Sequence, residues 1–232
     1  MKLMFEPQPP VIVPTTTGEA YPVRRIFCVG RNYAEHTKEM GFDPQRDPPF
    51  FFTKFAEAIV GEKATIAYPS GTKNFHHEIE LVVAIGKGGR NIKAADAEKH
   101  IWGYAVGLDM TRRDLQLEAR DKGRPWDTGK NVEQSAPLGL LHPKAEMGGL
   151  AQKGRIHLTV NGQTRQDADL ADLIWPVADV VEFLSKLWEL HPGDLIYTGT
   201  PAGVGAVVPG DVMHAEIAGL SPITIMVGPA AA

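Results

Sequence analysis

Residues 75–85 read Phe-His-His-Glu-Ile-Glu-Leu-Val-Val-Ala-Ile, which places two carboxylates, Glu78 and Glu80, at the start of an apolar run. The β-branched residues of this run predict a strand over residues 77–86. Because strand side chains alternate between faces, both carboxylates are expected on one face, close together. Two like charges beside an apolar sheet repel one another, and a divalent cation that prefers oxygen ligands removes the repulsion. The pair therefore predicts a cation site.

A third carboxylate, Asp109, ends the predicted strand 101–109. It is well placed to complete a three-carboxylate site for Mg²⁺ or Mn²⁺, which leaves positions for water and substrate oxygens. The residues alone also allow a second interpretation, in which Asp109 only caps the following helix and the two glutamates lie on a solvated face. A ligand from His76, on the same strand face, would shift the preference toward Zn²⁺ or Fe²⁺.

The remaining sequence predicts a β-rich α+β fold, because short strand-like runs are many and long helices few. Strands are expected at 25–29, 50–54, 63–67, 77–86, 101–109, 155–160, 194–198, 211–217 and 222–227. Asn161-Gly162 predicts a hairpin. Helices are expected at 111–122, opened by a capping box from Thr111 to Asp114, and at 176–190, with a short one at 33–40. Residues 1–23 are interpreted as an extended N-terminal segment and residues 24–232 as a single catalytic domain.

Composition narrows the function classes. The 232 residues carry a net charge of −4, from 24 basic and 28 acidic side chains, without a basic run, so no nucleic-acid or membrane partner is expected. No stretch approaches the ~20 apolar residues of a membrane span, and the N-terminus does not resemble a signal peptide. The single cysteine, Cys28, is expected to be a buried inert thiol in a reducing compartment, which predicts a cytoplasmic enzyme.

Two further groups could carry chemistry. His36 and Glu39 are spaced i, i+3, which on a helix lets a carboxylate orient an imidazole that acts as a general base. Residues 198–205 form a glycine-rich turn that could present backbone N–H groups to an anion or be a plain tight turn. Four isolated polar residues, taken singly, are expected at the surface: Lys54, Arg113, Gln116 and Lys130.

Six ordered motifs, at residues 30–36, 77–81, 107–116, 122–126, 129–130 and 198–205, together resemble the fumarylacetoacetate hydrolase family, in its branch of acylpyruvate and fumarylpyruvate hydrolases. The resemblance covers residues 24–227. It implies a mixed β-sandwich roll, a homodimer, and Mg²⁺ or Mn²⁺ held by Glu78, Glu80 and Asp109. One departure is that Phe55 follows Lys54, where the family often has proline, and this leaves the role of Lys54 open.

The resemblance also implies residue roles and a reaction. His36 and Glu39 would be a water-activating dyad. Substrate-contacting or charge-stabilising positions would be Lys130, Arg31, Gln116, Arg113, Gly199 and Thr200. The implied enzyme is a hydrolase of aromatic catabolism that cleaves a carbon–carbon bond in a 2,4-dioxo acid, fumarylpyruvate to fumarate and pyruvate. The distal carboxylate of that substrate needs a cation, for which Arg113, Arg120 and Arg124 are unranked candidates.

Three other functions fit the same residues. The site could decarboxylate or tautomerise oxaloacetate, or isomerise an unsaturated 2-oxo diacid. The chain could be a metabolite-binding protein that does no catalysis. It could also be a mononuclear iron oxygenase, although the histidine spacing fits that class poorly.

Overall fold

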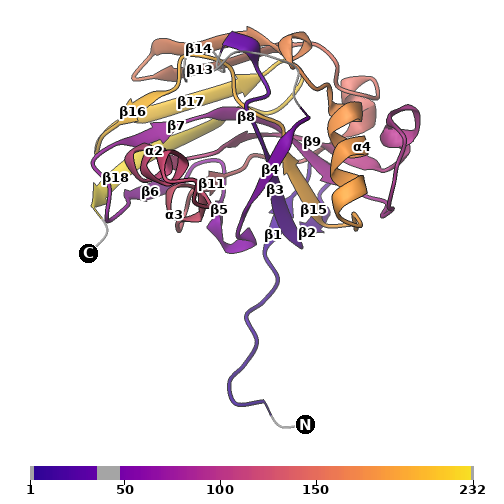
Figure 1. Cartoon of the computed structure of the whole chain (residues 1–232), viewed down its shortest axis with the longest axis horizontal. Helices are drawn as coiled ribbons and strands as arrows, with labels where there is room; N and C mark the ends of the chain where they lie inside the picture. Colours follow the sequence, from indigo (N-terminus) through magenta and orange to yellow (C-terminus); the bar gives the residue numbers. More distant parts are fainter. Residues whose placement is uncertain (1–2, 36–47, 231–232) are drawn as a thin grey trace.

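The computed structural model describes residues 3–35 and 48–230, and its strands form two large sheets that pack against each other (Figure 1). The first sheet has six strands in the order β12-β9-β8-β15-β3-β4. Their bounds are β3 (Arg25–Gly30), β4 (Phe50–Lys54), β8 (Ile79–Ile85), β9 (Ile101–Leu108), β12 (His142–Pro143) and β15 (Asp194–Tyr197). Strands β15 and β3 run parallel and the other neighbours antiparallel, so the sheet is mixed.

The second sheet has five strands in the order β14-β13-β17-β18-β6. Their bounds are β6 (Thr65–Tyr68), β13 (Arg155–Val160), β14 (Gln163–Asp169), β17 (Val212–Ile217) and β18 (Ile223–Ala230). Smaller sheets are formed by β7 (Phe75–His77), β10 (Thr111–Arg112) and β16 (Gly205–Val207), by β5 (Ile59–Val60) with β11 (Ala136–Pro137), and by β1 (Ile12–Pro14) with β2 (Ala20–Pro22). Together they make a β-rich sandwich.

The helices flank the strands on two sides of the view in Figure 1. The α-helices are α2 (Arg113–Asp121), α3 (Asp127–Lys130) and α4 (Val177–Leu187). Short 3-10 helices span η1 (Ala56–Ala58), η2 (Ala94–Lys99), η3 (Lys144–Met147) and η4 (Leu170–Asp172). Helix α4 buries Val177, Val180, Val181 and Leu184 as one apolar stripe in the main core. None of the described helices combines the length and the apolar character that crossing a membrane requires.

Strand β8 is apolar apart from Glu80 because both of its faces are buried. Leu81, Val83 and Ile85 belong to the main core between the two large sheets. Val82 and Ala84 point the other way, into a smaller core shared with Cys28. A Leu, Ile or Val side chain contributes about 1.5–3 kcal/mol when it is fully buried, so this central strand is a rigid base for the carboxylates at its start.

The N-terminal segment contributes to the smaller core. Strands β1 and β2 pair antiparallel, and Val13 and Tyr21 are buried. The Tyr21 hydroxyl donates to the carbonyl of Ile85 over 2.8 Å. The proline and threonine content of this segment indicated extended chain but did not reveal that part of it packs as a hairpin.

The predicted β-rich α+β fold is confirmed. Strands 50–54 and 155–160 have the predicted bounds, and Asn161-Gly162 connects β13 to β14, with positive φ angles of 52° and 75°. Cys28 is fully buried, and burial, followed by the charges of Asp109 and Glu80, raises the pKa of its thiol. The predicted helix 33–40 lies mostly outside the described residues.

Two local predictions are wrong. The strand expected at 77–86 is interrupted at Glu78, which links β7 to β8. The capping box does not form, because Thr111 and Arg112 are strand β10, paired with β7, and Arg112 is the N-cap of α2 without a side-chain cap. Asp114 instead accepts hydrogen bonds from the Thr72 hydroxyl, over 2.6 Å, and from the Lys73 N–H, over 2.9 Å. Tertiary contacts therefore replaced the local cap.

Candidate active site

Three buried carboxylates meet at the start of β8. Glu78 precedes the strand, Glu80 lies within it, and Asp109 directly follows the antiparallel neighbour β9. The Asp109 N–H donates to the carbonyl of Glu78 over 2.8 Å, which fixes the two segments side by side. One oxygen from each carboxylate lies within 4.8 Å of the others. The predicted three-carboxylate cluster is confirmed, and the interpretation as a helix cap with solvated glutamates is wrong.

Buried cations surround two of these carboxylates. The Lys130 ammonium donates to Glu78 Oε2 over 2.7 Å, to Asp109 Oδ2 over 2.6 Å and to the Thr111 hydroxyl over 2.8 Å. The Arg113 guanidinium bonds both Glu78 and the side chain of Gln116. Lys130, Arg113 and Gln116 are therefore buried parts of one network, and the expectation of surface positions is wrong.

Lys54 is also buried beside the cluster, contrary to the surface expectation. Its Nζ lies 2.9 Å from Asp109 Oδ1, outside hydrogen-bond geometry, and donates to the backbone carbonyls of Met110 and Lys130. Lys54 thus joins strand β4 to the segment that carries Asp109. The phenylalanine that follows it, in place of the proline common in the family, leaves this position intact.

Glu80 has different surroundings from the other two carboxylates. In residues 3–35 and 48–230 no ammonium or guanidinium lies within ion-pair distance of it, and its Oε2 accepts a hydrogen bond from the Gly199 N–H over 2.7 Å. Burial, followed by the charges of Asp109 and Glu78, raises the pKa of Glu80 well above its ordinary value. Among the described residues, Glu80 thus forms no direct ion pair of the kind that Glu78 and Asp109 form.

The donor set fits a divalent cation. The Oδ1 atom of Asp109 is buried and accepts no hydrogen bond from the described residues. Three carboxylates supply the hard oxygen ligands that Mg²⁺ and Mn²⁺ prefer. His76 is not part of the cluster, because its ring contacts Asn74 Oδ1 over 2.8 Å and the Arg113 Nε over 3.5 Å. A zinc or iron site with this histidine is therefore not supported.

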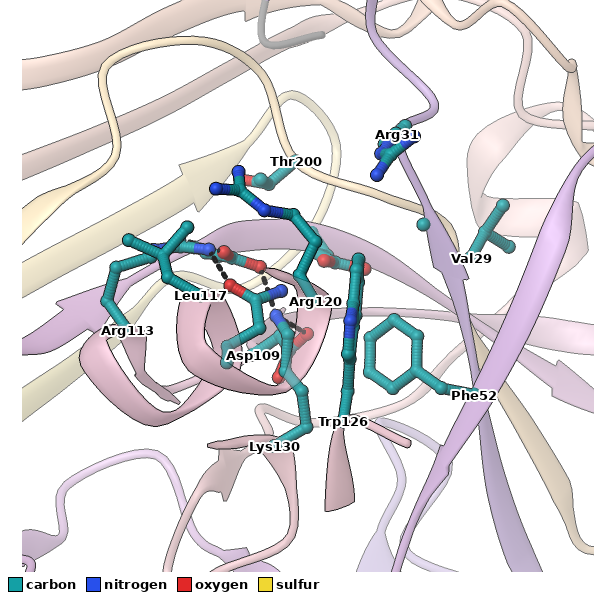
Figure 2. A pocket seen from close by; sticks show the side chains of 14 residues that line it. Val29, Arg31, Phe52, Asp109, Arg113, Leu117, Arg120, Trp126, Lys130 and Thr200 are labelled. Carbon is teal, nitrogen blue, oxygen red and sulfur yellow. Dashed lines mark hydrogen bonds and ion pairs between the residues drawn. The ribbon is translucent and has the colours of Figure 1, made fainter. Parts of the chain in front are cut away.

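A pocket opens above the cluster (Figure 2). One wall is a single face of α2, because residues spaced by three, four and seven positions share a helix side; these are Arg113, Gln116, Leu117 and Arg120. The opposite wall is aromatic: Phe52 on β4 and Trp126 before α3 have ring centroids 5.7 Å apart. Glu78, Glu80, Asp109 and Lys130 also line the pocket. The pocket therefore combines a charged base with one apolar wall.

The loop after β15 closes another side of the pocket. The Thr198 hydroxyl donates to the carbonyl of Leu81 over 2.9 Å, and the next residue, Gly199, donates its N–H to Glu80. Thr200 lines the pocket and accepts a hydrogen bond from Gln166 Nε2 over 2.7 Å, so its own O–H can donate elsewhere. The glycine-rich turn does present an N–H to an anion, and that anion is the protein's own carboxylate.

Gln166 is a site residue that the sequence did not reveal. It is fully buried in β14, and its Oε1 accepts a hydrogen bond from the Ile79 N–H over 3.1 Å and lies 3.0 Å from His77 Nδ1. Gln166 thereby connects the start of β8 to Thr200. The run from residue 163 to residue 169 is polar, so nothing in its pattern distinguishes this buried glutamine from its exposed neighbours.

Arg31 follows β3 and lines the pocket. Its φ angle is +59°, a left-handed conformation that is unusual for a residue with a side chain. The adjacent Asn32 fixes this loop, because its side-chain amide donates to the carbonyls of Thr198, over 2.8 Å, and Trp175, over 3.0 Å. The other predicted site residues, His36 and Glu39, lie outside the described residues.

We expect Gly199→Ala to destabilise the protein by more than its backbone strain alone. Gly199 has a φ of +101°, and a Cβ there would lie 2.6 Å from the Cβ of Asn32. A residue forced into such a conformation costs about 1–3 kcal/mol, and the contact adds to that cost and displaces the N–H that holds Glu80. Urea unfolding of the metal-free protein measures the loss.

Gly210→Ala is the matched control. Gly210 has a similar φ of +96°, but nothing lies within 4 Å of a Cβ built there. Its unfolding free energy should fall only by the cost of placing an alanine in this left-handed conformation. If the two variants lose equal stability, the close packing of Gly199 against Asn32 has no energetic importance.

Comparisons with known proteins agree with this geometry. The model of the fumarylacetoacetate hydrolase C-terminal family matches residues 25–227. A fumarylpyruvate hydrolase of a Ralstonia species is 50% identical over 188 residues, which are 81% of this chain and 97% of that protein. An oxaloacetate tautomerase of Escherichia coli K12 is 39% identical over 204 residues, 88% of this chain and 93% of that protein.

A solved structure shares the fold almost completely. The crystal structure of fumarylpyruvate hydrolase from Pseudomonas aeruginosa in complex with Mn²⁺ and pyruvate matches with a TM-score of 0.96 and 51% identity. The match covers 98% of this chain and 100% of that one. The mixed β-sandwich predicted from the sequence motifs is thereby confirmed.

Proposed function

The chain belongs to the fumarylacetoacetate hydrolase family, and from that premise we propose that it hydrolyses fumarylpyruvate to fumarate and pyruvate with Mg²⁺ or Mn²⁺ as cofactor. The observation that carries the proposal is the cluster of Glu78, Glu80 and Asp109 at the base of a pocket. Relatives about 50% identical to this chain are fumarylpyruvate hydrolases, and one of them is described with Mn²⁺ and pyruvate.

The reaction adds water across one carbon–carbon bond. The oxygen of water bonds to the C4 carbonyl carbon, and the C3–C4 bond breaks. Its electron pair stays with the three-carbon fragment as the enolate of pyruvate, which then takes a proton at C3. The difficult part is the negative charge that develops on this fragment, so the site must present positive charge and hydrogen-bond donors to it.

The base of the pocket supplies these groups. A divalent cation held by Glu78, Glu80 and Asp109 would supply positive charge next to the 2-oxo acid end of the substrate. Lys130 adds a buried ammonium at the same place, 5.1 Å from the Phe52 ring centroid. Gln116 and Thr200 are proposed to orient the substrate by hydrogen bonds, and Arg113 to hold Glu78 and Gln116 in position.

The activation of water is assigned to His36 and Glu39. The i, i+3 spacing of the two residues suits a carboxylate that orients an imidazole, and the family resemblance implies the same dyad. His36 would accept the proton of the attacking water and return it to the pyruvate fragment. This assignment rests on the sequence, because both residues lie outside the part of the chain that the structure describes.

The aromatic wall suits the acyl part of the substrate. The fumaryl group is flat and largely apolar between its two polar ends. Phe52 and Trp126 offer a flat apolar surface beside the charged base of the pocket, and Phe50 supports Trp126 edge-on at a centroid distance of 5.1 Å.

A second candidate function is the tautomerisation or decarboxylation of oxaloacetate at the same site. The observation in its favour is the 39% identity to oxaloacetate tautomerases. These reactions also build negative charge on a 2-oxo acid fragment, so the carboxylate cluster does not separate them from hydrolysis. The higher identity to fumarylpyruvate hydrolases favours hydrolysis.

The experiment that tests the function is a steady-state comparison of four substrates, fumarylpyruvate, maleylpyruvate, acetylpyruvate and oxaloacetate, with Mg²⁺ and with Mn²⁺. We expect the highest kcat/KM for fumarylpyruvate, with release of pyruvate. Reaction with oxaloacetate alone would replace the proposed function by the second candidate. Tight binding of these acids without turnover would favour a metabolite-binding protein.

Three further properties are proposed with this function. The family resemblance implies a homodimer, which analytical ultracentrifugation tests against the chain mass of 25.3 kDa. The single buried thiol of Cys28 suits the reducing cytoplasm. The substrate is a ring-opened product of aromatic degradation, so we place the enzyme in that catabolism.

A further inference from the structure

Two arginines line the pocket in addition to the cations that hold the carboxylate cluster. Arg31 follows β3 and Arg120 lies in the last turn of α2. In Figure 2 both guanidinium groups lie toward the Thr200 side of the view, and Lys130 and Asp109 lie below them. Two guanidinium groups therefore line a part of the pocket that is distinct from its base.

Arg31 is held in place by its surroundings. Its backbone has the left-handed φ of +59°, and the hydrogen bonds of Asn32 fix the loop directly after it. The Arg31 guanidinium lies 5.5 Å from the centroid of the Phe50 ring. A strained backbone at a pocket is commonly retained because it aims a side chain.

The charges of the two arginines act on each other. The pKa of Arg31 lies below its ordinary value, first because the side chain is partly buried and second because of the charge of Arg120. The two guanidinium groups are therefore close enough for their charges to act on the same part of the pocket. Arg120 also pairs with exposed Asp121 over 2.7 Å, a solvent-screened contact of low strength.

The other candidate arginines have different positions. The Arg113 guanidinium is buried and bonds Glu78 and Gln116, so its charge serves the cluster. Arg124 lines a groove with Phe50, Trp126 and Asp127 and is not among the residues that line the pocket. Arg120 lies seven residues, or about 10 Å, along α2 from Arg113. That distance is comparable with the length of an extended fumarylpyruvate chain.

We propose that Arg31 and Arg120 together bind the distal carboxylate of the substrate and make the enzyme selective for 2,4-dioxo diacids over monoacids. This assignment rests on the proposed function for the nature of the substrate. Guanidinium groups bind carboxylates through two parallel hydrogen bonds, so two of them can surround one carboxylate. The pair would thus select the substrate, and the cluster at the base would act on its other end.

The test uses two ligands that differ only in the distal carboxylate, 2-oxoheptanedioate and 2-oxoheptanoate. Neither has a 4-oxo group, so neither can be hydrolysed, and isothermal titration in the presence of Mn²⁺ reports binding alone. We expect the wild type to prefer the diacid by about 10- to 100-fold, the range of a charged hydrogen bond. Arg120→Met and Arg31→Asn should each lose most of this preference, and asparagine tolerates the left-handed backbone.

Arg124→Met is the matched control and should keep the wild-type preference. The assignment is overturned if the wild type does not prefer the diacid, if either pocket variant retains the preference, or if Arg124→Met loses it equally. If circular dichroism shows that Arg31→Asn does not fold, the comparison of Arg120→Met with Arg124→Met decides whether the assignment stands. Turnover of fumarylpyruvate by the wild type is measured separately, so failure of the proposed function is seen independently of this result.

Discussion

Glu80→Ala is expected to abolish the dependence of the enzyme on Mn²⁺. Glu80 is the carboxylate of the cluster that no described cation contacts, so its charge is the one that most requires a bound metal ion. For the wild type, Mn²⁺ at 100 times its Kd should raise the unfolding free energy by about 2.7 kcal/mol. For Glu80→Ala this increase should vanish, and turnover should fall to the metal-free level.

Isothermal titration with MnCl₂ and thermal unfolding with and without Mn²⁺ measure both effects. Glu118→Ala is the control, because Glu118 lies on α2 and pairs with Lys122 at the surface. It should respond to Mn²⁺ as the wild type does. An unchanged Mn²⁺ titration in Glu80→Ala would refute the assignment of the cation site.

His36→Ala should lower kcat by about 10²–10⁴, the usual loss when a general base is removed. Mn²⁺ binding should survive, because the three carboxylates remain. The pairing of lost turnover with intact metal binding separates the role of this histidine from that of Glu80. Glu39→Gln should lower kcat less, because the imidazole remains but loses the carboxylate that orients it.

The control for this prediction is His214→Ala. His214 lies in β17, and its ring contacts the Thr224 hydroxyl over 3.0 Å, away from the residues that line the pocket. Its kcat should equal that of the wild type. Near-normal turnover in His36→Ala would remove the dyad from the mechanism and require another acceptor for the proton of water.

The ion pairs around the cluster position the carboxylates more than they stabilise the fold. A buried ion pair loses solvation energy that its attraction only partly returns, and removing one partner costs about 3–5 kcal/mol. Lys130, Arg113 and Lys54 place three positive charges around Glu78 and Asp109. They therefore hold two of the three proposed metal-binding carboxylates, Glu78 and Asp109, in fixed positions, which a preorganised site requires.

The part of the site that follows from local geometry could be predicted from the sequence. Alternation along a strand predicted that Glu78 and Glu80 lie together, and they do, although Glu78 stands in the link before β8. Asp109 joins them because it follows an apolar strand, β9. The β-rich α+β character was also accessible, since apolar runs and the Asn161-Gly162 turn mark the strands, whereas the sandwich was implied by the family resemblance. These patterns depend only on neighbours in the chain.

The part that depends on distant contacts could not be predicted from single residues. Lys54, Lys130 and Arg113 each resemble a surface residue until the fold brings a carboxylate next to them. Gln166 is hidden within a polar strand, and its partner Thr200 lies 34 positions away. The capping box failed for a similar reason, because pairing of Thr111 with β7 outweighed the local helix signal.

The measurement that tests the central claim most directly is a single turnover of fumarylpyruvate in H₂¹⁸O with Mn²⁺, followed by mass spectrometry of the products. If water attacks the C4 carbonyl, each fumarate should carry one newly incorporated ¹⁸O atom, with one pyruvate formed per fumarate. Fumarate without the label would contradict hydrolysis at this site. An enzyme that converts oxaloacetate but releases no fumarate from fumarylpyruvate would contradict it as well.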